Sequence, residues 1–327
     1  MVVGKDEIPG STPALRYAAI DIGTVTCRLL VADLDCGILH ELEKGYAITN
    51  LGEGVDATGC LQPQAMKRVA DQLVQFQKRI DAHQDSGHPS IEVIVTATSA
   101  ARDAHNASEF LGMLRSLGLE PAIISGKKEA ALSFLGVGSS FPGERLLVID
   151  IGGGSTEISA GTAGQEPFLS RSMDVGCRRM TERFFHSDPP GEEELGKARS
   201  WAEGMLEAFF NDLGESGFSV DRMVAVAGTA TSAVAIQKEL QVYDSAQVHG
   251  SIMSKEELAR VFDGLRAITL AQRKKVVGLD PGRADVIVAG LAILGVALGL
   301  AGQEYFTVSE SDVLQGIILD RSIKRAH

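Results

Sequence analysis

The chain has 327 residues, with 31 Lys and Arg against 43 Asp and Glu, and 44% of its residues are hydrophobic. This ordinary globular mixture excludes a disordered, collagen-like or coiled-coil protein, and the length is typical of about two domains. The formal net charge of −12 argues against binding of nucleic acid or of an anionic membrane through a broad basic face. It leaves room for a small anion held in a locally basic cleft.

The first half of the chain alternates apolar segments with helical patterns. Between residues 63 and 82, apolar side chains step by three and four positions, which predicts a helix with one buried face. In chain order we expect strands at 18–22, 28–33, 38–48, 91–97 and 122–125, and helices at 63–82, 107–117 and 127–135. The order is therefore β-β-β-α-β-α-β-α.

The second half begins in the same way and continues with longer helices. We expect strands at 146–150, 157–160, 167–173, 223–227 and 305–308, and helices at 192–213, 230–240, 255–268, 285–300 and 312–324. Strands that alternate with helices predict an α/β protein whose sheets are covered on both faces. The apolar run at 286–301 is too short for the ~20 residues of a membrane span, so we expect a buried helix there.

Signals for targeting and redox state point to the cytoplasm. Residues 1–13 are charged and contain no apolar run, so we expect a loose arm and not a signal peptide. Four cysteines form no C-x-x-C pair, so we expect reduced thiols.

One segment of the sequence occurs twice. Residues 18–30 read AAIDIGTVTCRLL and residues 147–159 read LVIDIGGGSTEIS, which places Asp21 and Asp150 at equivalent positions 129 residues apart. A duplicated domain explains this spacing and agrees with the length. We expect the two domains to meet at a cleft, with their junction inside residues 125–137.

Each copy of the repeat has a small polar turn after its aspartate. The backbone N–H groups of such turns form a concavity that binds anions, and the serine and threonine hydroxyls add donors. The turn at 152–156 is rich in glycine, whereas the turn at 23–26 is less so and is followed by Arg28. A third turn, with Gly228 and Thr229, follows a later strand. Each turn alone could instead be an ordinary hairpin or strand-to-helix turn, but the repetition favours two phosphate-binding loops.

Acidic side chains beside these loops suggest a metal and a base. Asp21 and Asp150 stand at strand ends, where two carboxylates with water and phosphate oxygens suit Mg²⁺. Glu157 follows the second loop, and its alternative is a solvated strand residue. Glu129 falls in the first turn of a helix, where the helix dipole alone favours a carboxylate.

Basic residues near the loops suggest a focused positive cleft. They are Arg28, Arg102, Lys127, Lys128, Arg178, Arg179 and Arg283. Any one of them alone could be a solvated surface charge.

Seven segments together resemble the exopolyphosphatase/guanosine pentaphosphate phosphohydrolase family, within the acetate kinase–sugar kinase–Hsp70–actin superfamily. They lie at 18–33, 95–111, 123–137, 146–159, 224–235, 282–294 and 308–316 and span nearly the whole chain. The resemblance implies two ribonuclease-H-like (actin-like ATPase) domains with an interdomain active-site cleft. We expect domains at 14–127 and 128–312, the helix at 313–327 packing back on the first, and thus the family's short two-domain form.

The resemblance also implies Mg²⁺-dependent release of terminal phosphate. It matches Glu129 to the family's catalytic glutamate, and Asp150 and Glu157 to acidic residues at the metal and the attacking water. Together with the strand-end position of Asp21, we expect catalytic roles for Glu129 and Glu157 and metal binding by Asp21 and Asp150. The residues expected to bind the substrate phosphates are Thr24, Thr26, Arg28, Arg102, Gly152, Gly153, Gly154, Ser155, Thr156, Gly228 and Thr229. The chain departs from the family's pattern in three places. Lys128 replaces the first glutamate of the usual E-E pair, and Val25 and Cys27 differ from the usual residues of the first loop. Residues 309–315 are less basic than the corresponding family segment.

The expected function is therefore an exopolyphosphatase acting on inorganic polyphosphate, without nucleic-acid or membrane partners. The alternatives are a guanosine pentaphosphate phosphohydrolase, a kinase of the same superfamily, and a non-catalytic sensor that binds polyphosphate or guanosine tetraphosphate. We expect polyphosphate to be preferred over guanosine pentaphosphate, with short chains sufficing. The possibility of a homodimer stays open.

Overall fold

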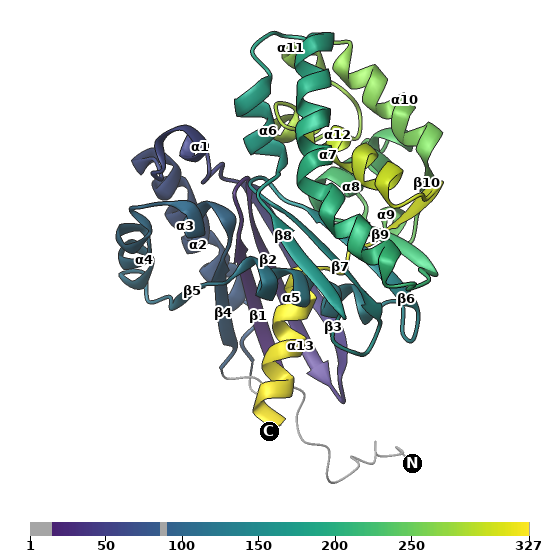
Figure 1. The fold of residues 1–327 in the computed structure, drawn as a ribbon. Coiled ribbons are helices and arrows are strands. Elements are labelled where there is room, and N and C mark those ends of the chain that lie inside the picture. Colours follow the sequence, from purple (N-terminus) through teal and green to yellow (C-terminus); the bar gives the residue numbers. More distant parts are fainter. Residues whose placement is uncertain (1–14, 86–89, 327) are drawn as a thin grey trace, which may run out of the picture.

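The computed structural model describes residues 15–85 and 90–326. The arm expected at residues 1–13 lies outside the described residues. Over that described part, the chain forms one five-stranded and one six-stranded sheet, each flanked by helices (Figure 1). Within it, none of the helices is long and apolar enough to cross a membrane.

The first sheet has the strand order β3-β2-β1-β4-β5. Its strands are β1 (Leu15–Ile22), β2 (Thr26–Asp35), β3 (Ile38–Ile48), β4 (Glu92–Ala97) and β5 (Pro121–Ile123). The first three pair antiparallel, whereas β4 and β5 pair parallel to β1 and β4. On one face lie α1 (Val55–Thr58), α2 (Pro63–Asp81), α3 (Ser99–Asp103) and α4 (Ala107–Arg115), and we call this sheet and these helices lobe I.

The second sheet repeats this order and adds one strand. Its order is β10-β11-β9-β6-β7-β8, so β8-β7-β6-β9-β11 corresponds to β3-β2-β1-β4-β5 with the same strand directions. The strands are β6 (Arg145–Ile151), β7 (Thr156–Thr162), β8 (Leu169–Met173), β9 (Arg222–Val226), β10 (Ile252–Ser254) and β11 (Tyr305–Val308). This topology confirms the α/β fold with two ribonuclease-H-like domains.

The helices on the outer side of the second sheet complete what we call lobe II. They are α6 (Cys177–Phe184), α7 (Glu192–Glu215), α8 (Ala227–Gln237), α9 (Ser245–Val248), α10 (Lys255–Arg266), α11 (Leu270–Arg273) and α12 (Ile287–Leu300). The apolar run expected to be a buried helix is α12, which packs on α7 and α10 in the largest core.

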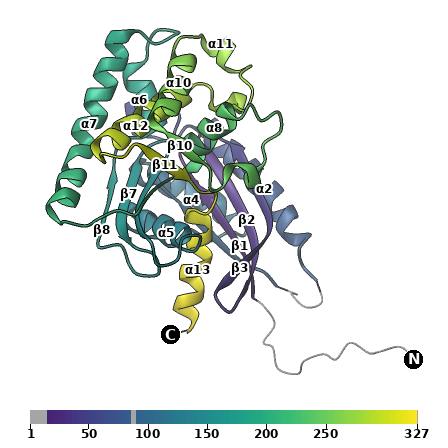
Figure 2. The ribbon, with the colours of Figure 1, turned by 90° about the vertical axis from the view of Figure 1, so that its right-hand side faces the viewer.

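Two helices fill the space between the sheets. Helix α5 (Gly126–Gly138) packs on β6–β8, and α13 (Val313–Ala326) packs on β1 and β2 and against α5 (Figure 2). Helices α5 and α13 approach each other too closely at their crossing for a side chain to fit between them. A Cβ on Gly316 would lie 1.9 Å from the carbonyl oxygen of Leu132, so the crossing requires glycine there. This close crossing fixes the beginning of α5, and with it Glu129, relative to the two sheets.

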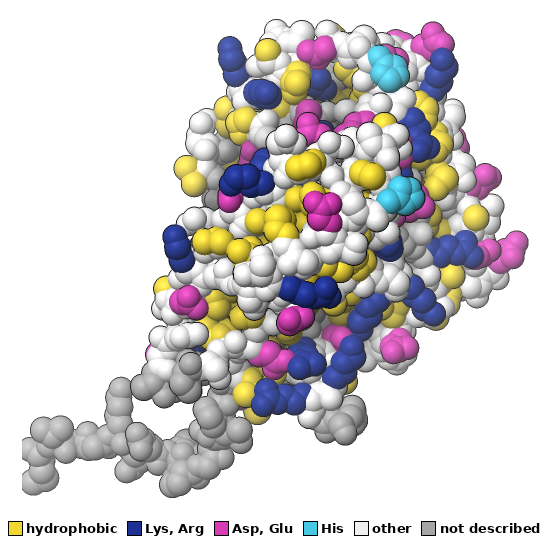
Figure 3. All heavy atoms as spheres, turned by 90° about the vertical axis from the view of Figure 1, so that its left-hand side faces the viewer, with side chains coloured by type: hydrophobic (Ala, Val, Ile, Leu, Met, Phe, Trp, Pro, Cys, Tyr) yellow, Lys and Arg dark blue, Asp and Glu magenta, His cyan; other side chains and the backbone are white. Residues whose placement is uncertain are grey.

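The surface carries both signs of charge. Figure 3 shows one face on which basic and acidic side chains are interspersed with apolar atoms. Several of the basic side chains in the chain are bound to carboxylates, as in the Lys67–Asp71 pair at 2.7 Å and the Arg321–Glu92 pair at 2.5 Å.

Candidate active site

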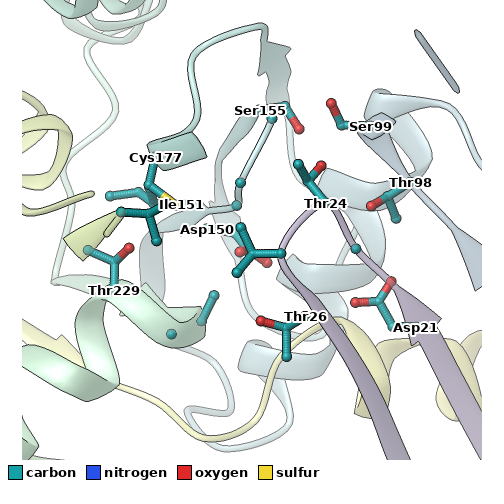
Figure 4. Close-up of a pocket in the computed structure, with 18 of the residues that line it drawn as sticks. Asp21, Thr24, Thr26, Thr98, Ser99, Asp150, Ile151, Ser155, Cys177 and Thr229 are labelled. Atoms are coloured by element: carbon teal, nitrogen blue, oxygen red, sulfur yellow. The ribbon is translucent and has the colours of Figure 1, made fainter. Parts of the chain in front are cut away.

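A cavity of about 80 Å³ lies where the two lobes meet (Figure 4). Both turns of the sequence repeat border it, together with the beginning of α8. The candidates that line it are Asp21, Thr24, Thr26, Arg28, Glu129, Asp150, Gly152, Gly153, Gly154, Ser155, Gly228 and Thr229. The structure therefore brings together candidates from four separate stretches of the chain.

The two turns have the same backbone geometry. The N–H of Gly23 donates to the carbonyl of Thr26 at 3.0 Å, and the N–H of Gly152 donates to the carbonyl of Ser155 at 3.0 Å. Each turn joins the first two antiparallel strands of its sheet, so the two lobes present equivalent loops to one cavity. The sequence repeat is thus a structural repeat.

The two copies of the repeat differ in the charge of the residue that pairs with the aspartate on the neighbouring strand. In the strand register Asp21 faces Arg28, whereas Asp150 faces Glu157. The lobe I aspartate therefore has a cation beside it, and the lobe II aspartate has a second carboxylate. This asymmetry gives the cavity a neutralised side and an acidic side.

On the neutralised side, Arg28 holds two aspartates. Its Nη2 donates to Asp21 Oδ2 at 2.7 Å, and its Nη1 donates to Asp312. Asp312 also caps the beginning of α13, where its Oδ1 accepts from the N–H of Leu314 at 3.0 Å. Burial raises the pKa of Asp21, and the Arg28 charge opposes that rise. The other oxygen of Asp21, Oδ1, is buried and has no hydrogen-bond partner among the described residues.

On the acidic side, Asp150 and Glu157 are both almost fully buried. The Ser133 hydroxyl donates to Asp150 Oδ2 at 2.9 Å, and the Ser172 hydroxyl donates to Glu157 Oε1 at 2.6 Å. Burial raises the pKa of Asp150 to about 6. Burial and the neighbouring Asp150 charge raise the pKa of Glu157 as well.

Glu129 projects from the first turn of α5 to the edge of this acidic group. The Ser125 hydroxyl caps the helix by accepting from the N–H of Lys128 at 3.2 Å. Burial raises the pKa of Glu129 well above its usual value, and the charges of Glu157, Asp21 and Asp150 add to the rise. Arg102 Nη1 opposes it from 3.3 Å. A carboxylate in this setting holds a proton more readily than an exposed one, which suits a group that accepts a proton during a reaction.

Two candidates support the site from behind the cavity wall. Arg102, on α3, contacts Glu129, and its Nη1 also donates to the carbonyl of Ile124 at 3.3 Å. Glu157, on β7, is 3% exposed and bonded to Ser172. Neither lines the cavity in this structure.

Thr156 does not line the cavity, unlike residues 152–155 of the same loop. Its hydroxyl donates to the carbonyl of Val175, and its side chain is fully buried away from the cavity. Successive side chains of a strand point to opposite faces, and Thr156 is the first residue of β7. The Thr156 hydroxyl therefore ties the end of the loop to Val175, and a contact with phosphate stays a prediction.

Three further basic residues named from the sequence are used elsewhere. Lys128 Nζ donates to Asp320 on α13 at 2.6 Å. Arg178 and Arg179, on α6, donate to Asn50 and to Asp56 of lobe I at 2.5 and 2.6 Å. These groups join elements of the fold and do not form part of the cavity's positive lining.

Other lining residues carried no role in the sequence reasoning. Thr98 and Ser99 follow β4, the parallel neighbour of β1, and face the cavity beside Thr24 (Figure 4). The signal was available, because the carboxyl ends of adjacent parallel strands meet at one sheet edge. Arg283, which the sequence analysis named among the basic residues near the loops, also lines the cavity, and burial lowers its pKa. Its guanidinium stands 5.7 Å from the Tyr46 ring centre.

Several known proteins are similar to this chain in sequence and in fold. Exopolyphosphatase 2 of Mycobacterium tuberculosis is 38% identical over 323 residues, which cover 93% of this chain and 98% of that protein. The crystal structure of the Aquifex aeolicus Ppx/GppA family member aligns with a TM-score of 0.78 and 31% identity, over 96% of this chain and 100% of that one. An exopolyphosphatase from Cytophaga hutchinsonii aligns with a TM-score of 0.83 and 26% identity, over 94% and 98%. The sequence pattern of the Ppx/GppA phosphatase family matches residues 30–324, and this chain is therefore a member of that family.

Proposed function

We propose that this protein is an exopolyphosphatase that hydrolyses the terminal phosphoanhydride bond of inorganic polyphosphate. The observation that carries the proposal is the placement of two equivalent loops and a partly buried glutamate, Glu129, around one small cavity. The relatives named exopolyphosphatase, which match the chain over more than nine-tenths of its length, support the same substrate class.

The residues present fit a divalent cation. Asp21 Oδ1 is a buried carboxylate oxygen to which the described part of the chain offers no hydrogen-bond partner, and an uncompensated buried charge is costly. Over the described part of the chain, no three acidic, His or Cys side chains converge as a complete metal site. Asp21 and Asp150 would hold Mg²⁺ with water and substrate oxygens as the remaining ligands, which is common for this ion. The ion would supply positive charge to the phosphate oxygens.

The protein's own groups account for binding and charge stabilisation. We propose that the N–H groups of residues 153–155 and the hydroxyls of Thr24 and Ser155 donate to the terminal phosphate. Arg28 and Arg283 add positive charge at the cavity wall. Because the leaving group is itself an anionic phosphate, holding and neutralising the phosphates carries most of the rate.

Glu129 is the proposed general base. Its carboxylate would orient a water molecule for in-line attack and accept its proton. Glu157 would tune this group by its nearby negative charge, since that charge raises the pKa of Glu129. Arg102 would keep the Glu129 carboxylate in place through the 3.3 Å contact.

A second cavity favours guanosine pentaphosphate as the alternative substrate. It measures about 490 Å³ and shares Arg28, Gly228 and Arg283 with the first cavity. Tyr46 and Tyr243 contribute aromatic surface, and a volume of this size accepts an organic group of drug-like dimensions. A nucleoside could occupy this space while its phosphates reach the loops.

One experiment separates these substrates. Phosphate release is measured from long-chain polyphosphate, tripolyphosphate, guanosine pentaphosphate and ATP, each with and without MgCl₂. We expect the largest kcat/KM on polyphosphate and a requirement for MgCl₂. A larger kcat/KM on guanosine pentaphosphate would favour the alternative. No release from any of them, by protein with a normal unfolding transition, would refute the enzyme assignment. A Glu129→Gln preparation controls for contaminating phosphatases.

A further inference from the structure

The carbonyl groups of the three glycines in the glycine-rich loop, residues 152–154, are held by the beginning of α6. The N–H groups of Cys177 and Arg178 donate to the carbonyls of Gly152 and Gly153 at 3.0 and 2.8 Å. The third carbonyl, that of Gly154, accepts from Nε of the Arg179 side chain at 2.9 Å.

Holding these carbonyls fixes the direction of the loop's donors. A peptide unit is planar and trans, so its N–H points opposite to its C=O. With the carbonyls of residues 152–154 turned toward α6, the N–H groups of residues 153–155 turn toward the cavity that these residues line. Those N–H groups make no backbone hydrogen bond within the described residues, so they are available to an anion.

Arg179 differs from the other two anchors because it also reaches across to lobe I. Its Nη1 donates to Asp56 Oδ1 of α1 at 2.6 Å, and its Nη2 donates to Asp103 Oδ2 of α3 at 2.5 Å. The side chain is only 16% exposed. All three nitrogens of one rigid guanidinium therefore form hydrogen bonds at once, one with the glycine-rich loop and two with lobe I.

We propose that Arg179 is a positioning residue that couples contact between the lobes to the alignment of the phosphate loop. The two aspartates of lobe I orient the planar guanidinium, and the guanidinium holds the Gly154 carbonyl. If the lobes separate, Arg179 loses two of its three partners, and the peptide between Gly154 and Ser155 is no longer fixed. The protein would then bind a terminal phosphate fully only when the lobes are in contact. This inference rests on the proposed function only in taking the loop as a phosphate site.

A neighbouring arginine provides a matched control. Arg183 lies one turn further along α6 and also binds Asp56, with Nη2 at 2.9 Å from Oδ2. It joins the lobes at the same acidic side chain, but among the described residues its hydrogen bonds go to Asp56 and not to the loop, and its side chain is 42% exposed. Replacing Arg183 removes an interlobe ion pair without removing the bond to Gly154.

The experiment compares Arg179→Met, Asp103→Asn and Arg183→Met with the natural protein. Orthophosphate binding in the presence of MgCl₂ is measured by calorimetry, kcat and KM are measured on tripolyphosphate, and the unfolding transition is recorded. We expect Arg179→Met to weaken orthophosphate binding by about tenfold and to lower kcat/KM by about 10- to 100-fold, as a misplaced binding group does. Asp103→Asn, which weakens a partner of Arg179 and leaves the Arg179 side chain in place, should reproduce a measurable part of the binding loss, at least about threefold. Arg183→Met should stay within about twofold.

Each outcome bears on the proposal. Binding by Arg179→Met within twofold of the natural protein would overturn the positioning role. Unchanged binding by Asp103→Asn would overturn the coupling to lobe I. If Arg183→Met lost as much orthophosphate binding as Arg179→Met, any ion pair between the lobes would have the same effect. That result would contradict a specific role of the Arg179 bond to Gly154. The orthophosphate-binding measurement decides these points even if the natural protein releases no phosphate from tripolyphosphate. A lack of phosphate release would count against the proposed function and not against this proposal.

Discussion

Replacing Glu129 by glutamine tests the proposed base most directly. The amide has nearly the same shape, and its oxygen can still accept from Arg102 Nη1, which stands 3.3 Å from the carboxylate in the natural protein. The Ser125 cap and the glycine crossing with α13 do not involve the replaced atoms. The substitution therefore removes the proton acceptor and leaves the surrounding packing intact.

The expected loss follows from the role assigned to the group. A positioned general base contributes about 10²- to 10⁴-fold, which corresponds to about 3–5 kcal/mol of activation free energy. The side chain is 13% exposed and is surrounded by the carboxylates of Glu157, Asp21 and Asp150, which raise its pKa. Removing one negative charge from this group should leave the metal-free protein at least as stable as before. KM should change by less than about threefold, because the loops that bind phosphate are unchanged.

The measurement is phosphate release from tripolyphosphate across pH 5 to 9, with the unfolding transition as a check of folding. Because the base must be ionised and its pKa is raised, activity of the natural protein should fall as pH falls through that pKa. This limb should be lost in Glu129→Gln. Glu256→Gln, an exposed carboxylate in the first turn of α10, is the control and should retain full activity. A Glu129→Gln variant with at least a tenth of the natural kcat would refute the assignment.

Three other predictions concern the metal, pH and packing. Asp150→Asn should raise the MgCl₂ concentration for half-maximal activity and lower kcat, and an unchanged titration midpoint and rate would contradict metal binding. Without metal, Asp150 makes folding less favourable as pH rises, because its folded pKa of about 6 exceeds its ordinary value of 3.8. This loss amounts to at most about 3 kcal/mol between pH 4 and 7. In urea unfolding at both pH values, the natural protein should therefore lose more stability than Asp150→Asn, in which the raised pKa values of Glu129 and Glu157 remain. Parallel pH profiles of the two proteins would refute it. Gly316→Ala should destabilise by about 1–3 kcal/mol in urea unfolding because its Cβ meets the Leu132 carbonyl oxygen, whereas Gly295→Ala, with open space around its Cβ, should be neutral or stabilising. Equal unfolding midpoints for the two alanine variants would contradict the packing argument.

The sequence alone determined the repeated architecture, because that architecture depends on local patterns. The helix α2 was predicted within one residue of its bounds from the spacing of its apolar side chains. The duplicated I-D-I-G segments placed Asp21 and Asp150 at equivalent strand ends, and the register of both hairpins agrees with that equivalence. Periodicity and repetition are properties of neighbouring residues, so they can be detected without knowledge of distant contacts.

The short helices near the site escaped this reasoning. Helices α1, α3 and α6 have four, five and eight residues, too few to show a clear apolar period. Isolated helices of that length are marginal in water and form through tertiary packing. These three elements carry Asp56, Arg102, Asp103 and Arg179, so the contacts between the lobes could not be predicted with them.

Only the tertiary structure decided which charged side chains serve the cavity and which serve the framework. Arg28 meets Asp312, which lies 284 positions away, and Arg179 meets Asp56 from 123 positions away. Lys128, next to Glu129 in sequence, turns instead to Asp320 on α13. A charged side chain takes the partner that burial and the crossing of distant elements bring to it, and chain neighbours do not determine that partner. The chemical types at the site were therefore evident from the sequence, whereas their pairing required the folded chain.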